Sequence, residues 1–301
     1  VKTNEVKTIL KNFVPVFISR GVVQISAYID ALLASLLPTG ALAGLSYAQT
    51  LYMLPISLFG MSVSAAELPA MSKVSGNTSD VAKGLQKRIN NSIKRIAFYI
   101  VPSTVGFFIL GDCIVAAIYQ TGKFTTRDTF FVWMVLAGST VGLFATTQSR
   151  LFSSAFYAMH DTKTPLKFAL IRVVLSSTLG YCASQYAPYF LHINTLYGTV
   201  GITVASGLSG WVEYRMLRYT LSKVVGKVTL GKRYIVSLWI CALIAAGVAY
   251  PIKSMLHYHP ITIALIVLSL YGIIYFALSL LFKIDEMKNL LLKLDIIRKD
   301  L

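Results

Sequence analysis

The sequence predicts an all-α, polytopic membrane protein with about eight transmembrane helices. Apolar stretches long enough to cross a bilayer recur along its 301 residues, which are 55% hydrophobic and only 13% charged, with a mean hydropathy of +0.66. The positive charge gathers in alternate connections between these stretches. A soluble domain with a net charge of +16 would suggest nucleic-acid binding, but it could not bury so much apolar surface. We therefore interpret the charge as a topology signal and expect no nucleic-acid partner.

Eight stretches have the length needed to span a membrane. A hydrocarbon core about 30 Å thick requires roughly 20 apolar residues in helical form, because unpaired backbone groups are costly in lipid. The second stretch contains Pro55 and Pro69, each of which removes a backbone donor, so we expect that helix to be bent. The predicted spans are residues 13–37, 41–71, 96–118, 128–150, 165–187, 197–219, 234–252 and 260–282.

The basic residues predict the orientation. Residues 2–11, 73–95, 150–167, 215–233 and 283–299 hold 23 of the 28 lysines and arginines. The opposite connections hold only Lys123, Arg127 and Lys253. Because basic loops stay on the cytoplasmic side, both termini are predicted to be cytoplasmic. Residues 283–301 mix leucines with lysines at helical spacing, which predicts an amphipathic helix on the inner membrane surface.

Charged residues inside predicted spans are the first functional candidates, since each costs about 2.5–3.5 kcal/mol on insertion scales. Arg20 could extend back to the cytoplasmic surface or face a hydrated cavity and contact an anionic substrate group. Asp30, ten residues further on, is too far along the helix to pair with Arg20. Arg172 is expected to extend to the inner surface, and Glu213 and Arg215 to form a local network there.

One face of the second span is lined by small and polar residues, which allows two interpretations. Such a face is typical of close helix packing, but it could also line a polar cavity, and a carboxylate in a packed seam would need a partner. The face consists of Ser46, Thr50, Met53, Ser57, Gly60, Ser64 and Glu67. The complete set of candidate cavity residues is Arg20, Gln24, Asp30, Gln49, Thr50, Ser57 and Glu67.

Enzymatic and cofactor chemistry find no support in the sequence. It contains no Gly-rich phosphate loop, no paired nucleophile and base, and no cluster with metal-ligand spacing, so we expect no enzyme, cofactor or metal site. Cys113, Cys182 and Cys241 lack disulfide or metal spacing and are expected to be small buried apolar residues.

Five segments carry a resemblance to a known family: residues 29–40, 47–55, 68–72, 122–124 and 155–165. The last contains Phe156-Tyr157 followed by Asp161-Thr162-Lys163-Thr164-Pro165. In order and spacing the chain resembles the C-terminal part of the MurJ (MviN) family across residues 1–220, with weaker agreement beyond. These proteins are bacterial lipid II flippases of the multidrug, oligosaccharidyl-lipid and polysaccharide exporter superfamily.

The resemblance implies a domain organisation. Family members have two six-helix lobes and two further helices, so this chain would hold helices seven to fourteen. Residues 1–12 would be a cytoplasmic linker, 13–220 the C-lobe, 221–233 a basic cytoplasmic loop, 234–282 the two additional helices and 283–301 the amphipathic tail. The missing N-terminal lobe of the same protein would be its partner.

The resemblance also implies a function: transport without catalysis in the bacterial cytoplasmic (inner) membrane. The substrate would be the undecaprenyl-diphosphate-linked peptidoglycan precursor, with membrane lipids as further partners. One departure matters, because the family usually has Tyr-Ala-Asp-Arg-Leu where this sequence has Gln49 and Thr50. We therefore hypothesise that Arg20 supplies the missing positive charge.

Two alternatives remain open on the sequence alone. One is a flippase or exporter of the same superfamily that moves another substrate. The other is a non-transporting membrane scaffold that recruits cell-wall enzymes, an interpretation that the absence of arginine at position 50 keeps open.

Overall fold

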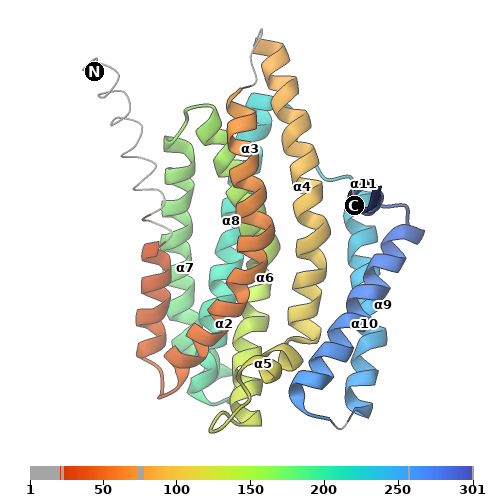
Figure 1. The fold of residues 1–301 in the computed structure, drawn as a ribbon. Helices are drawn as coiled ribbons and strands as arrows, with labels where there is room; N and C mark the ends of the chain where they lie inside the picture. Colours follow the sequence, from red (N-terminus) through yellow and green to blue (C-terminus); the bar gives the residue numbers. More distant parts are fainter. Residues whose placement is uncertain (1–20, 22–23, 74–77, 257, 300–301) are drawn as a thin grey trace, which may run out of the picture.

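The computed structural model describes residues 21, 24–73, 78–256 and 258–299, and all regular structure within them is helical (Figure 1). This confirms the predicted all-α class. A helix over residues 24–35 comes first. It is followed by α2 (Ala41–Pro55), the π-helical segment η1 (Ile56–Met61), α3 (Ser62–Ser72), α4 (Thr78–Ile109), α5 (Gly111–Tyr119), α6 (Thr126–Ala158), α7 (Lys163–Phe190), the 3₁₀ turn η2 (Thr195–Tyr197), α8 (Gly198–Val225), α9 (Lys232–Met255), α10 (Pro260–Leu281) and α11 (Asp285–Lys299).

Six of the helices in the described part of the chain are long and apolar enough to cross a membrane: Ala41–Ser72, Asp80–Ile109, Thr126–Ala158, Lys163–Phe190, Lys232–Met255 and Pro260–Leu281. Within the predicted span 13–37, residues 13–20 and 22–23 lie outside the described residues, and residues 24–35 are helical. The predicted span 197–219 corresponds to α8, in which glycine, serine and threonine dilute the apolar content where the helix packs between α6 and α7. The count of eight and the cytoplasmic termini therefore stay predictions.

The second span is interrupted where the sequence predicts. Pro55 has no backbone N–H, and the π-helical segment η1 begins at the next residue. Pro69 lies within α3, which nevertheless continues to Ser72. Gly60 in η1 lies so close to α6 that an added Cβ would come 2.4 Å from Cγ2 of Thr147. The backbone of this span therefore lies close against α6 at Gly60.

The predicted single span over residues 96–118 is wrong in its bounds. Helix α4 begins at Thr78 and ends at Ile109, and the short α5 crosses the end of the bundle (Figure 1). Leu110 leaves the helical conformation between them. Gly111 then allows the indole of Trp133 to come close, since an added Cβ would lie 2.7 Å from Cδ1 of that ring.

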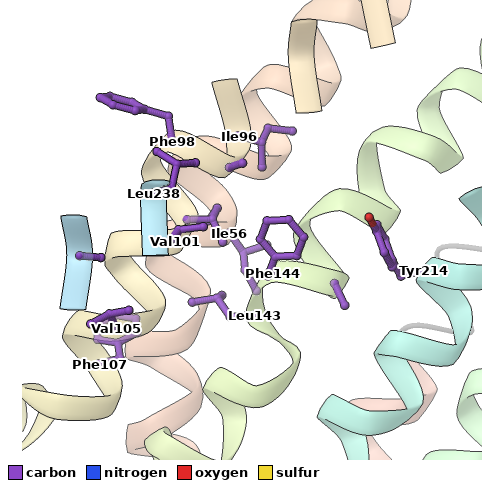
Figure 2. Close-up of a cluster of buried hydrophobic side chains, with 14 of the residues drawn as sticks. Ile56, Ile96, Phe98, Val101, Val105, Phe107, Leu143, Phe144, Tyr214 and Leu238 are labelled. Carbon is purple, nitrogen blue, oxygen red and sulfur yellow. The ribbon is translucent and has the colours of Figure 1, made fainter. Parts of the chain in front are cut away.

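Helix α6 is the centre of the fold. It starts with a capping box, in which the Asp128 amide donates to the Thr125 hydroxyl and the Thr125 amide donates to the Asp128 carboxylate. It packs against α2, α3, α4, α5 and α8, with its most extensive contact on α8. Figure 2 shows the apolar core formed around it, where Ile56, Leu143 and Tyr214 come from three different elements.

Helices α9 and α10 pack against each other beside α4 (Figure 1). Tyrosine hydroxyls hold them to α4. Tyr234, Tyr275 and Tyr271 donate to the carbonyl oxygens of Lys94, Phe98 and Pro102 at 3.1, 2.7 and 2.8 Å. The acceptors are four residues apart and therefore lie along one face of α4. At the opposite end of α9, Lys253 pairs with Asp112 of α5.

The cysteines divide by burial. Cys113 and Cys241 are buried, as expected, whereas Cys182 is exposed on α7, so the expectation was wrong for that residue. All three are free thiols.

Candidate functional site

Two adjoining cavities lie among the helices. The first, the α2 cavity, has a volume of about 300 Å³ and borders residues 45–56 of α2 and η1. The second, the α3 cavity, has about 540 Å³ and borders residues 61–68 of η1 and α3. Both volumes are in the range of small-molecule sites, about 300–1,000 Å³.

The two cavities share part of their wall. Five residues line both: Gln24, Met53, Thr146, Arg150 and Arg172. These residues come from four elements and form a layer between the cavities, which we call the waist. Two of the five are arginines, so a polar group moving from one cavity to the other would pass two guanidinium groups.

Arg172 of α7 is paired within the protein. Its Nη1 donates to Oε2 of Glu213 on α8 at 3.0 Å, and the two side chains are only 15% and 7% exposed. A buried charge is tolerated when it is paired and hydrogen-bonded. The expected extension of Arg172 to the inner surface is therefore wrong, and so is the expected local network of Glu213 with Arg215.

Arg150 of α6 has a different environment. The three ion pairs between described residues are Arg88–Glu67, Arg172–Glu213 and Lys253–Asp112, so none includes Arg150. Its Nε is buried and has no hydrogen-bond partner among the described residues. From the sequence this arginine belongs to a cytoplasmic connection. It lies in the waist instead because α6 continues for two more turns, to Ala158.

Three of the seven candidate residues line the α2 cavity: Gln24, Asp30 and Gln49. Asp30 is 7% exposed, and its Oδ1 has no hydrogen-bond partner among the described residues. Arg20, the proposed substitute for the family arginine, lies outside the described residues. The hypothesis that Arg20 supplies the missing positive charge therefore stays a prediction.

The other three candidates line neither cavity. The hydroxyls of Thr50 and Ser57 donate to backbone carbonyls one turn earlier, those of Ser46 and Met53, at 3.0 and 2.7 Å. Glu67 lies 3.6 Å from Arg88 of α4.

The polar face of the second span serves both of the purposes that the sequence left open. Gly60 packs against Thr147, whereas Met53 and Ser64 line cavities. Packing and cavity lining therefore both occur on this face, while Ser46, Thr50 and Ser57 are exposed.

Sequence reasoning missed Arg150, Arg172 and Glu213 as cavity residues. The available signal was that α6 and α7 each carry one arginine within two or three turns of a basic connection, while α8 carries a glutamate at similar depth. The depth of a residue along its helix does not determine the direction in which its side chain points. The rotation of α6, α7 and α8 about their own axes brings these three side chains to the α3 cavity.

The family segment at residues 155–165 has a structural explanation. The carboxylate of Asp161 accepts hydrogen bonds from the amides of Lys163 and Thr164 at 3.1 and 3.0 Å, and from the Thr164 hydroxyl at 2.6 Å. These contacts satisfy amide groups that the first turn of a helix leaves free. The segment thus starts α7, the helix that positions Arg172.

Comparison with known proteins agrees with this architecture. The family described as lipid II flippase MurJ matches residues 1–270. A probable lipid II flippase MurJ of Rickettsia prowazekii (strain Madrid E) is 32% identical over 213 residues, covering 71% of this chain and 39% of the relative. One from Rhizobium tropici is 32% identical over 221 residues, covering 73% of this chain and 39% of that protein. The chain thus spans about two fifths of the length of these curated relatives.

A solved structure shows the same fold. It is a lipid II flippase MurJ in an inward closed conformation, 25% identical in sequence, and it superposes with a TM-score of 0.75. The match covers 95% of this chain and 56% of that one. On the family match and on the identity to its members, the chain belongs to the lipid II flippase MurJ family.

Proposed function

We propose that this chain is the C-terminal part of a flippase that moves lipid II, the lipid-linked peptidoglycan precursor, across the bacterial cytoplasmic membrane. The single observation that carries the proposal beyond family membership is a polar interior. Two adjoining cavities among the apolar helices are lined in part by arginines and by serine and threonine hydroxyls.

Such an interior meets the main physical demand of flipping. A charged headgroup cannot enter hydrocarbon without a large loss of solvation, whereas a hydrated cavity with fixed polar groups replaces that solvation. The two cavities lie on either side of the waist, which fits a path that is opened first to one side of the membrane and then to the other.

The exposed face of α2 supports a second lobe as partner. Thr50 and Leu54 of α2 and Leu58 of η1 are exposed here, the two leucines at 50% and 63%, and the neighbouring Gln49 is partly exposed and also lines the α2 cavity. The Thr50 hydroxyl bonds to its own helix, but the Gln49 amide is an expensive group to leave in lipid. We assign this face to contact with the N-terminal lobe of the same protein across a hydrated space.

The test is depletion of the protein in its own bacterium. Lipid II should accumulate in the inner leaflet and become inaccessible to a lipid II-cleaving enzyme added from outside. Unchanged access after complete depletion, with normal lipid II synthesis, would contradict the proposal. Accumulation of another lipid-linked precursor would instead assign the protein to a different exporter of the superfamily.

A second experiment tests the need for a partner lobe. Residues 1–301 reconstituted alone into vesicles should not translocate the headgroup, because the face of α2 has no opposing lobe. Translocation by this chain alone would show that the N-terminal lobe is dispensable.

A further inference from the structure

The α3 cavity contains hydrogen-bond donors that lack acceptors. Ser64 of α3 and Ser149 of α6 are 5% and 3% exposed, and the hydroxyl oxygen of each has no partner among the described residues. Both residues line the α3 cavity, and so does Arg150, whose Nε is also buried without a partner.

These serines differ from most others in the protein. Ser46, Ser57 and Ser72 each donate to the carbonyl four residues earlier in the same helix, which is the usual way for a hydroxyl in an apolar helix to be satisfied. Ser64 and Ser149 have no such bond. Because a buried, unpaired polar group costs about 1–3 kcal/mol, a group bound in the cavity that accepts their hydrogen bonds would offset this cost.

The charge of the α3 cavity selects the kind of ligand. Its charged lining residues are Arg150, Arg172 and Glu213. Arg172 and Glu213 neutralise each other at 3.0 Å, which leaves Arg150 as the excess charge. An excess guanidinium repels a cation and attracts an anion. Guanidinium and hydroxyl donors together match the oxygen atoms of a phosphate group.

We propose that Arg150, Ser64 and Ser149 form a binding site for a phosphate or diphosphate group in the α3 cavity. The assignment of that anion to the diphosphate of the lipid-linked substrate rests on the proposed function; the anion site itself does not. In this protein the site supplies a cationic contact of the C-lobe from α6, whereas position 50 carries threonine. Arg172 is not assigned to the site, since Glu213 already pairs with its charge.

The test is binding of inorganic pyrophosphate to the purified full-length protein, measured as the concentration dependence of its thermal unfolding midpoint. Pyrophosphate should raise the midpoint of the wild type, because a ligand that binds only the folded state stabilises it. Arg150→Gln should weaken the apparent affinity by about tenfold or more, the loss expected for a charge-assisted hydrogen bond. Ser64→Ala with Ser149→Ala should weaken it less, and Arg150→Lys should keep part of it.

Arg215→Gln is the matched control, because Arg215 is exposed on α8 and lines neither cavity, so its loss changes the net charge by the same amount. Its pyrophosphate affinity should equal that of the wild type. An equal loss in both arginine variants would reveal a general charge effect and overturn the site. No pyrophosphate effect on the wild type would overturn it too, with water then filling the cavity. If Arg150→Gln unfolds, the serine double variant and Arg150→Lys decide the question.

A competition experiment separates the site from the proposed function. Undecaprenyl diphosphate in detergent presents the same anion on a lipid and should compete with pyrophosphate in the wild type. Pyrophosphate binding that depends on Arg150 but is not displaced by the lipid would keep the anion site and overturn its assignment to the substrate. Failure of the depletion experiment, by contrast, would leave the binding result unaffected.

Discussion

Tyr275 of α10 donates a hydrogen bond to the carbonyl oxygen of Phe98 on α4 at 2.7 Å. Pro102 explains why that carbonyl needs an outside donor. In an α-helix the carbonyl of residue 98 accepts from the amide of residue 102, and proline has no amide hydrogen. The tyrosine therefore replaces a backbone hydrogen bond and fastens α10 to α4 at the same time.

Tyr275→Phe should lower the unfolding free energy by about 1–3 kcal/mol, because the buried Phe98 carbonyl is left without a donor. The effect should shrink when Pro102 is replaced by alanine, since the new amide hydrogen can occupy the free acceptor. The measurement is a double-mutant cycle on the thermal midpoint of the purified protein at one heating rate. Additive losses in the double variant would show that the proline and the tyrosine are not coupled.

Tyr271→Phe is the control for that cycle. Tyr271 donates to the carbonyl of Pro102 at 2.8 Å, and this carbonyl has the amide of Gly106 as its ordinary helical donor. The loss should therefore be smaller than for Tyr275→Phe. A larger loss would mean that packing of the rings, rather than the free carbonyl, determines the contact.

Gly142→Ala should destabilise the contact between α6 and α8. A Cβ at Gly142 would lie 2.5 Å from Cα of Gly207, and backbone atoms cannot move aside as a flexible side chain does. Overpacking of this kind costs about 1–3 kcal/mol or more. The matched control is Gly247→Ala on α9, where an added Cβ meets nothing within 4 Å. Its thermal midpoint should match or exceed that of the wild type, because alanine favours helix.

Equal midpoints for the two alanine variants would contradict the close α6–α8 contact. Glycines such as Gly207 on α8 are typical of close helix contacts. The sequence could not predict that Gly207 meets Gly142, because a helix face can be read from spacing while its partner on another helix cannot.

Glu213→Gln should destabilise the protein by about 3–5 kcal/mol, as expected when one partner of a buried ion pair is removed. Replacing both partners by apolar residues, Arg172→Met with Glu213→Leu, should recover most of the loss, since no uncompensated charge then remains. Thermal midpoints of the wild type and the two variants test this. A double variant as unstable as the single one would show that Arg172 has a further partner that holds it in place.

The sequence predicts the positions of the helices better than it predicts which side chains line the candidate site. The long helices, the interruption at Pro55 and the membrane class follow from hydropathy and from the missing amide of proline. Gln24, Asp30 and Gln49 line the α2 cavity, and their contact with substrate stays a prediction. Arg150 and Arg172 were assigned to the inner surface because sequence gives depth and not rotation, and because the end of α6 was placed two turns too early. Tertiary packing of α6, α7 and α8 decides both points.

The orientation is tested by labelling single cysteines at Lys123 and Lys227 in a variant without the native cysteines. Both lysines are exposed, Lys123 in the turn before α6 and Lys227 in the loop after α8. The positive-inside rule places Lys123 outside and Lys227 in the cytoplasm. A membrane-impermeant maleimide added to intact cells should therefore label Lys123→Cys alone, and both should react once the membrane is permeabilised.

Labelling at position 227 is the more informative of the two measurements. Its backbone carbonyl accepts from the Gln86 side chain at 3.0 Å, and the neighbouring Thr229 amide donates to Asn90 at 3.1 Å, so this loop is held against the basic half of α4. The loop and the start of α4 must lie on the same side of the membrane. Labelling of Lys227→Cys in intact cells would therefore contradict the predicted orientation of both this loop and the start of α4.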